Sequence, residues 1–195
     1  MKKILAVILV LLVLLVTVSA CVELDPITIL KEKLSQTTKA TMVVHTIEVL
    51  AGTQQLSLQK DTYTVGGDSV TLSSTLTQLN PDYVSDGQKL VTTTQTETLT
   101  TEQFQQKIPH TINFTMESLV AESYSATANG STVAHTMEIL PQCFSQFLSI
   151  TQQQANTISN LQVTVLEFDE IVTSIKLSYT SNNGNQVTIT YSFTY

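Results

Sequence analysis

The C-terminal sequence IVTSIKLSYT (residues 171–180), SNNGNQ (181–186) and VTITYSFTY (187–195) decides the fold. In the first and last of these segments, large apolar residues alternate with Thr, Ser or Lys. A period of two predicts strands with one apolar and one polar face. Asn183-Gly184 between them is a hairpin signal. Val163 and Val165 repeat the pattern upstream, so we predict an antiparallel three-stranded meander.

The predicted meander has one apolar row on each of its last two strands. The first row consists of Ile171, Thr173, Ile175, Leu177 and Tyr179, and the second of Val187, Ile189, Tyr191, Phe193 and Tyr195. The acidic cluster Glu167-Phe168-Asp169-Glu170 falls between two strands, and we interpret it as a solvated turn. It lacks the ligand spacing of a calcium loop.

The preceding part of the chain also predicts strands. Residues 41–50 are rich in β-branched side chains, which favour strands. Gly66-Gly67-Asp68, Asp86-Gly87 and Asn129-Gly130 are turn signals between further alternating segments. A middle segment supplies three apolar residues in one phase: Val70, Leu72 and Leu76.

Two segments predict helices. Asp25-Pro26 is a typical helix start, and the apolar residues that follow at helical spacing predict a helix ending near Lys39. Pro141 opens the second, whose apolar stripe contains Phe144, Phe147 and Leu148. We therefore predict an α+β fold: a single strongly curved antiparallel sheet, or half-barrel, whose concave apolar face is covered by two helices. A β-sandwich with peripheral helices is the alternative.

The N-terminus predicts export. Lys2 and Lys3 precede an apolar run over residues 4–16, which is about 13 residues against the roughly 20 of a membrane-spanning helix. We predict a signal peptide over residues 1–20, a tether over 21–24 and a single domain over 25–195. An uncleaved anchor, or a secretory cut that leaves Cys21 as a thiol, are the alternatives.

Val18-Ser19-Ala20-Cys21 resembles a bacterial lipobox. The order of lipobox, helix, strands, Tyr83-x-x-Asp86-Gly87, inserted helix and meander resembles the lipoprotein-carrier (LolA-like) half-barrel family and its cell-envelope relatives. The lipobox resemblance implies acylation of Cys21 and a lipid anchor on the extracytoplasmic face of a cell membrane. The family resemblance implies an apolar cavity for acyl chains.

Charge and motifs exclude several functions. Without the signal peptide, seven Lys and no Arg face sixteen acidic residues, which gives a net charge of −9 and argues against nucleic-acid binding. His45, His110 and His135 lack metal-ligand spacing, and no catalytic motif is present. Cys143 has no cationic neighbour in sequence to activate it. We expect no enzyme activity, no metal and no cofactor, and the sequence names no protein partner.

We therefore predict a membrane-tethered lipoprotein that binds or carries an apolar ligand such as a lipid. The alternative is a non-enzymatic interaction or structural lipoprotein with a filled core. The predicted lining of the ligand cavity comes from the middle strand, the last two strands and the second helix: Val70, Leu72, Leu76, Phe144, Phe147, Leu148, Ile175, Leu177, Ile189 and Tyr191.

Overall fold

The computed structural model describes residues 26–80, 90–107, 121–148 and 150–195. The predicted signal peptide, Cys21, the Tyr83–Gly87 motif and His110 therefore lie outside the described residues. Among the helices that the structure describes, none is long and apolar enough to cross a membrane.

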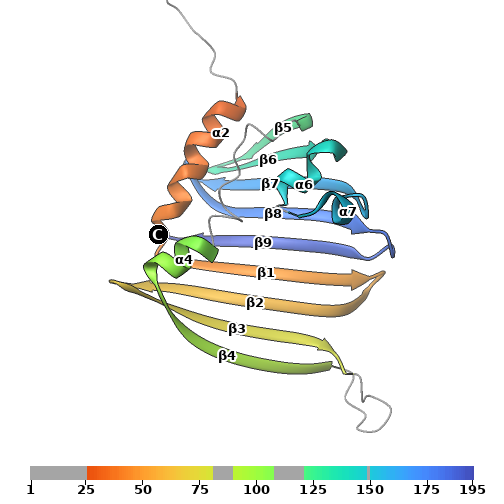
Figure 1. Ribbon diagram of the computed structural model, residues 1–195. Coiled ribbons are helices and arrows are strands. Elements are labelled where there is room, and N and C mark those ends of the chain that lie inside the picture. The colour runs from red at the N-terminus through yellow and green to blue at the C-terminus, as the bar shows by residue number, and fades with distance from the viewer. Residues whose placement is uncertain (1–25, 81–89, 108–120, 149) are drawn as a thin grey trace, which may run out of the picture.

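In the part of the chain that the structure describes, nine strands form one open antiparallel sheet (Figure 1). In sheet order they are β4 (Leu90–Thr100), β3 (Ser69–Leu79), β2 (Gln54–Gly66), β1 (Met42–Ala51), β9 (Gln186–Thr194), β8 (Ile171–Ser181), β7 (Ile158–Phe168), β6 (Thr132–Ile139) and β5 (Ala121–Asn129). Neighbouring strands are also neighbours in sequence, except for β1 and β9. The C-terminal strand therefore lies at the centre of the sheet and joins its two halves.

The helices are short. They are α2 (Pro26–Ser35), the 3-10 helix η1 (Gln36–Lys39), α4 (Thr101–Lys107), the 3-10 helix η3 (Pro141–Cys143), α6 (Phe144–Phe147) and α7 (Gln152–Ala155). α2 and η1 contact β8, whereas α4 contacts β3 and β4. The predicted first helix thus ends at Ser35 and continues as a 3-10 turn to Lys39.

The predicted fold of two helices covering a half-barrel is wrong. The described chain is mostly strand, and the expected second helix is broken into η3, α6 and α7. The break has a local cause, because Thr151 caps a new helix: its hydroxyl accepts a hydrogen bond from the Gln154 amide, and the Gln154 side chain accepts one from the Thr151 amide. Short helical segments cannot span a nine-stranded sheet.

The predicted meander is confirmed, since β7 pairs with β8 and β8 with β9. The apolar row predicted on β8 was wrong at its first residue, Ile171. Thr173 is an extra residue between the pairs Leu166–Ser174 and Glu167–Val172, so β8 contains a bulge. The bulge moves Val172 into the core and leaves Ile171 41% exposed.

One face of the sheet, which we call the inner face, carries the core. Its buried strand residues include Val43, Tyr63, Val70, Leu72, Leu99, Val163, Val165, Ile175, Leu177, Tyr191 and Phe193. Leu30 and Leu34 of α2 and Phe144 of α6 complete the same cluster. The opposite, outer face of β3, β4 and β9 is dominated by Thr and Ser, as the alternation in sequence predicts.

Candidate functional site

The inner face changes character across the sheet. On β9 and β1, the apolar pairs Val187–Val49 and Ile189–Ile47 lie side by side, and all except Val187 are half-buried. On β2, the residues paired with Val49 and Ile47 are Ser57 and Gln59. An apolar strip on β9 and β1 therefore adjoins a polar area on β2, β3 and β4.

A recess of about 520 Å³ lies in this polar area. It is lined by Gln59, Asp61, Tyr63, Leu72, Ser74, Gln95, Thr96 and Glu97. The side chains of Tyr63 and Leu72 are largely buried and give it apolar surface, whereas Gln95 and Glu97 are exposed at the edge strand. The volume is within the range of small-molecule sites.

Asp61 is the central polar group of the recess and is only 6% exposed. It accepts hydrogen bonds from Ser74 Oγ at 2.5 Å and from Gln59 Nε2 at 2.8 Å. His45 Nδ1 lies 3.6 Å from Asp61 Oδ2, beyond hydrogen-bonding distance. The Asp61 carboxylate lies between Ser74 and His45, so these residues do not form the Ser–His–Asp order of a nucleophilic triad.

His45 and Tyr63 are perturbed by burial. Burial lowers the pKa of His45, and the neighbouring Asp61 carboxylate opposes this shift. The imidazole also stacks on Tyr191, with ring centroids 4.6 Å apart. Burial raises the pKa of Tyr63, and the charges of Asp61 and Glu97 add to the effect. Burial therefore favours a neutral imidazole at His45 and a neutral phenol at Tyr63, both close to Asp61.

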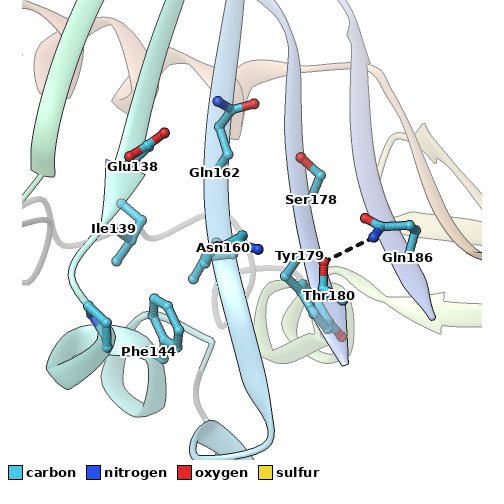
Figure 2. Close-up of a pocket in the computed structure, with 11 residues that line it drawn as sticks. Glu138, Ile139, Phe144, Asn160, Gln162, Ser178, Tyr179, Thr180 and Gln186 are labelled. Atoms are coloured by element: carbon cyan, nitrogen blue, oxygen red, sulfur yellow. Dashed lines mark hydrogen bonds between the residues drawn. The ribbon is translucent and has the colours of Figure 1, made fainter. Parts of the chain in front are cut away.

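A second recess, of about 450 Å³, lies where β6 to β9 approach α6 (Figure 2). Apolar and polar side chains mix in its lining: Glu138, Ile139, Pro141, Phe144, Asn160, Leu161, Gln162, Ser178, Tyr179, Thr180 and Gln186. Asn160 has a φ of 56° and lies in a register shift of β7. Gln186 donates a hydrogen bond to Thr180 Oγ1 at 3.0 Å, so part of the polar lining of this recess is already paired.

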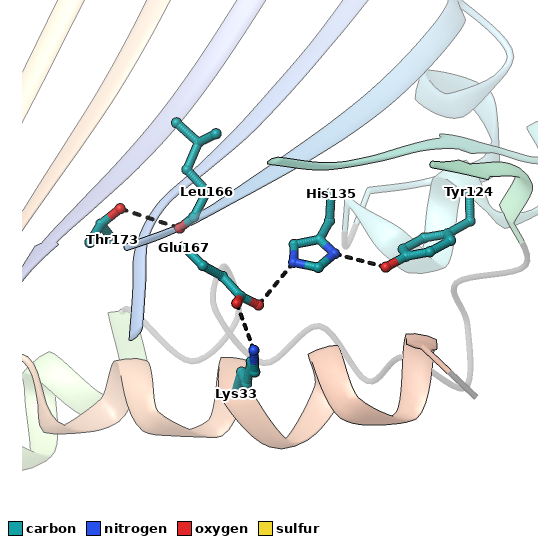
Figure 3. A network of polar contacts seen from close by, with 6 residues as sticks. All are labelled: Lys33, Tyr124, His135, Leu166, Glu167 and Thr173. Carbon is teal, nitrogen blue, oxygen red and sulfur yellow. Dashed lines mark hydrogen bonds and ion pairs between the residues drawn. The ribbon is translucent and has the colours of Figure 1, made fainter. Parts of the chain in front are cut away.

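A network of polar side chains connects α2 to the strands β7, β6 and β5 (Figure 3). Lys33 Nζ donates to Glu167 Oε2 at 2.6 Å. His135 Nε2 lies 3.0 Å from Glu167 Oε1, but the two atoms are not aligned as a hydrogen bond. On its other side, His135 Nδ1 shares a hydrogen bond of 2.8 Å with the Tyr124 hydroxyl.

The interpretation of residues 167–170 as a solvated turn was therefore wrong for Glu167, which is 2% exposed. Only Asp169 and Glu170 form the turn, both with positive φ. The sequence did contain a signal, because Glu167 is in phase with Val163 and Val165. Asp61 was also missed, although it is in phase with Tyr63.

The ten predicted cavity residues are distributed over the core. Seven belong to the buried cluster: Val70, Leu72, Phe144, Phe147, Ile175, Leu177 and Tyr191. Leu148 and Ile189 pack against it, and Leu76 is half-buried on the inner face. Of the ten, Leu72 lines the recess at Asp61 and Phe144 lines the second recess, while the other eight line neither.

Within the described residues, no group of His, Cys, Asp and Glu is arranged to hold a metal ion. Cys143 is half-buried. No family model matches the chain, and no curated protein matches it with significant similarity.

Proposed function

We propose that the protein is a membrane-tethered extracytoplasmic lipoprotein that binds an apolar ligand such as a lipid on the inner face of its sheet. The observation that carries this proposal is the junction of the apolar strip on β9 and β1 with the recess at Asp61. A molecule with an apolar tail and a polar head fits such a junction.

The tail would contact side chains that the fold leaves half-buried. Gln59, at the margin of the recess, pairs across the strands with Ile47 on one side and Leu76 on the other. Ile189 is the next neighbour of Ile47. Covering these side chains with an alkyl chain removes apolar surface from water, which contributes about 25 cal/mol per Å².

The head would lie among groups that form hydrogen bonds. Gln95 can donate or accept, and the oxygens of Ser74, Gln59 and Asp61 can accept, since the Ser74 hydroxyl already donates its proton to Asp61. The tether would be the acylated Cys21, for which the lipobox resemblance is the support. Two acyl chains on this Cys give stable anchoring, whereas a single chain binds only marginally.

Ligand binding is tested with the full chain extracted in mild detergent. Leu76→Trp fills the inner face beside Gln59, and Leu58→Trp is its matched control, because Leu58 is also half-buried but lies on the outer face opposite Thr77. We expect Leu76→Trp to weaken binding of a neutral fluorescent apolar probe about tenfold or more, a loss of about 1.4 kcal/mol. Leu58→Trp should bind as the wild type does.

Extraction and mass spectrometry of copurified lipid provide the second measurement. A wild-type protein that carries no lipid and takes up no probe would remove the ligand-binding proposal. The tether is tested separately, since Cys21→Ser should release the protein from membranes or leave the precursor uncut. Wild-type fractionation of a cleaved Cys21→Ser protein would exclude the lipid anchor.

A second candidate function is supported by the outer face. Its rows of Thr and Ser on β3, β4 and β9 carry little charge, and seven of the predicted cavity residues belong to the packed core. These features favour a structural or interaction lipoprotein that displays hydroxyl groups. The probe experiment separates the two, because a protein with a filled core takes up no apolar ligand.

A further inference from the structure

The strand β4 forms an open edge of the sheet. Within the described part of the chain it pairs on one side only, with β3. This pairing runs through all eleven residues of Leu90–Thr100 without a register shift. Each residue from 92 to 98 is exposed. Among the described residues, the backbone edge of β4 that faces away from β3 is therefore unpaired and available to another strand.

Apart from one charged residue, Glu97, this edge lacks the features that usually prevent strand pairing. Protected edges are short, bulged, or carry Lys, Pro or inward-pointing charges. β4 has no Lys and no Pro, and its single charged residue is Glu97. The opposite edge strand, β5, is shorter and has a bulge between Ala121 and Ser123. The two edges thus differ in their capacity to pair, and β4 is the one suited to it.

We propose that β4 pairs antiparallel with β4 of a second copy of this chain, joining two sheets about a two-fold axis. Residues directly opposite each other in an antiparallel pair point to the same face. A two-fold axis perpendicular to the sheet exchanges the two strands. At this axis, one residue of β4 must therefore lie directly opposite the same residue of the second copy. Gln95 is the midpoint of Leu90–Thr100, so only a pairing centred on Gln95 uses the whole strand.

The sequence of β4 is complementary to itself in this register. On the inner face, Val91 lies opposite Leu99, Thr93 opposite Glu97, and Gln95 opposite Gln95. On the outer face, the pairs are Thr92–Thr98 and Thr94–Thr96. Apolar and Thr–Thr cross-strand pairs are favourable, and Gln95 can form an amide hydrogen bond with its copy.

Charge also favours a centre at Gln95 over its neighbours. A pairing centred on Glu97 would place two carboxylates opposite each other, which is destabilising. In the register centred on Gln95, each Glu97 lies opposite a neutral Thr93. Because Gln95, Thr96 and Glu97 line the recess at Asp61, pairing would place the recesses of the two copies on either side of the axis. The pairing itself does not depend on the proposed ligand.

The test is a charge exchange at Gln95, followed by sedimentation of the full chain in mild detergent. Gln95→Lys and Gln95→Glu each place two like charges at the axis, so each should weaken the dimer at least tenfold. An equimolar mixture of the two variants should restore a dimer, which would be a heterodimer by native mass spectrometry. Ser125→Lys, on the exposed β5 edge, should leave the wild-type dimer unchanged.

Circular dichroism and melting temperatures show whether the variants are folded, so that a lost dimer is not mistaken for a lost fold. A wild type that is monomeric at all concentrations up to hundreds of micromolar would overturn the proposal. A dimer that survives both Gln95 substitutions, or that Ser125→Lys disrupts instead, would also overturn it. Restoration by the mixture would support both the strand and its register.

Discussion

Glu167 continues the inner-face row of Leu161, Val163 and Val165, yet it is a carboxylate among apolar side chains. Such a group is costly to bury unless it is paired. Lys33 supplies a charged partner from α2, and the His135 ring of β6 lies 3.0 Å from the other carboxylate oxygen. The network therefore fixes the position of α2 on the sheet as well as neutralising the carboxylate.

The first prediction concerns this carboxylate. Glu167→Gln keeps the shape of the side chain but removes the charge that Lys33 contacts. Hydrogen bonds to charged groups contribute about 1.5–3 kcal/mol, and Lys33 is partly exposed, so we expect a loss near 1.5 kcal/mol in the free energy of unfolding. Urea unfolding measures it. The control Glu170→Gln, in the neighbouring turn, should change stability by less than about 0.5 kcal/mol.

The second prediction concerns pH. Burial lowers the pKa of His45 below its usual value of 6.5, so the unfolded chain takes up a proton at a higher pH than the folded chain does. Stability from His45 is therefore complete above pH 6.5 and decreases as the pH falls towards the folded pKa. The groups that face His45 are Asp61 of β2 and Tyr191 of β9.

Comparing the wild type with His45→Gln isolates this contribution. Between pH 7.5 and 5.5 the unfolding free energy of the wild type should fall more steeply than that of His45→Gln, measured in urea at fixed ionic strength. Equal slopes for the two proteins would show that His45 has the same proton affinity in the folded and unfolded chains.

At the scale of elements, β9 is the strand on which the sheet depends most. It pairs with β1 over nine residues and with β8 on its other side. Its inner-face residues Val187, Tyr191 and Phe193 are buried. The last segment of the chain thus connects the N-terminal half of the sheet, β1 to β4, to the later half, β5 to β8.

The third prediction is that removing residues 187–195 unfolds the protein. Each large buried side chain contributes about 1.5–3 kcal/mol, whereas the total stability of a domain is about 5–15 kcal/mol. Loss of the native circular dichroism and of the thermal transition is the expected result. The control removes Tyr195 alone, whose half-buried hydroxyl donates to the Val172 carbonyl at 2.8 Å, and should leave a folded protein with a lower melting temperature.

The sequence could predict the elements that depend on local pattern. The final meander and the hairpins at Asn129-Gly130 and Asn183-Gly184 follow from alternation and turn residues, and Gly130 and Gly184 have the positive φ that such turns require. The bulge at Thr173 could not be predicted, because its register depends on the pairing partner. The prediction of one continuous second helix was also wrong, since Thr151 caps a new helix and the apolar stripe does not prevent this break.

The candidate site was predicted less well than the strands. Apolar alternation identifies inner-face residues such as Leu72 and Ile189, but it cannot tell a packed core from a ligand-binding surface. Asp61 and Glu167 were overlooked because a charged residue at a position where the alternation calls for an apolar one looks like the end of a strand. Lys33, the partner of Glu167, is 134 residues away in sequence, whereas Gln59 and Ser74, the partners of Asp61, lie on the same strand and on the next one. In both cases the pairing register is needed to show that the carboxylate is buried and paired.

At the scale of the whole molecule, charge constrains the ligand. The chain has no Arg and a formal net charge of −7, or −9 without the two Lys of the predicted signal peptide. The recess contains the buried Asp61 and the exposed Glu97, and none of its lining residues is Lys. A carboxylate or phosphate head would therefore meet like charges with no cation in the lining to balance them.

The fourth prediction is that a ligand with a cationic or neutral head binds more tightly than an anionic one of equal tail length. Dodecylamine and dodecanol should displace a neutral apolar probe at concentrations at least several-fold below those of dodecanoate. Glu97→Gln should lower the concentration of dodecanoate that displaces the probe and leave that of dodecanol unchanged, because the substitution removes the exposed charge at the rim of the recess. Added salt should also reduce the difference between dodecanoate and dodecanol, since exposed charges are screened over about 10 Å at 0.1 M. Equal displacement by all three would show that the head does not occupy the recess at Asp61, while the tail site on β9 and β1 would still stand.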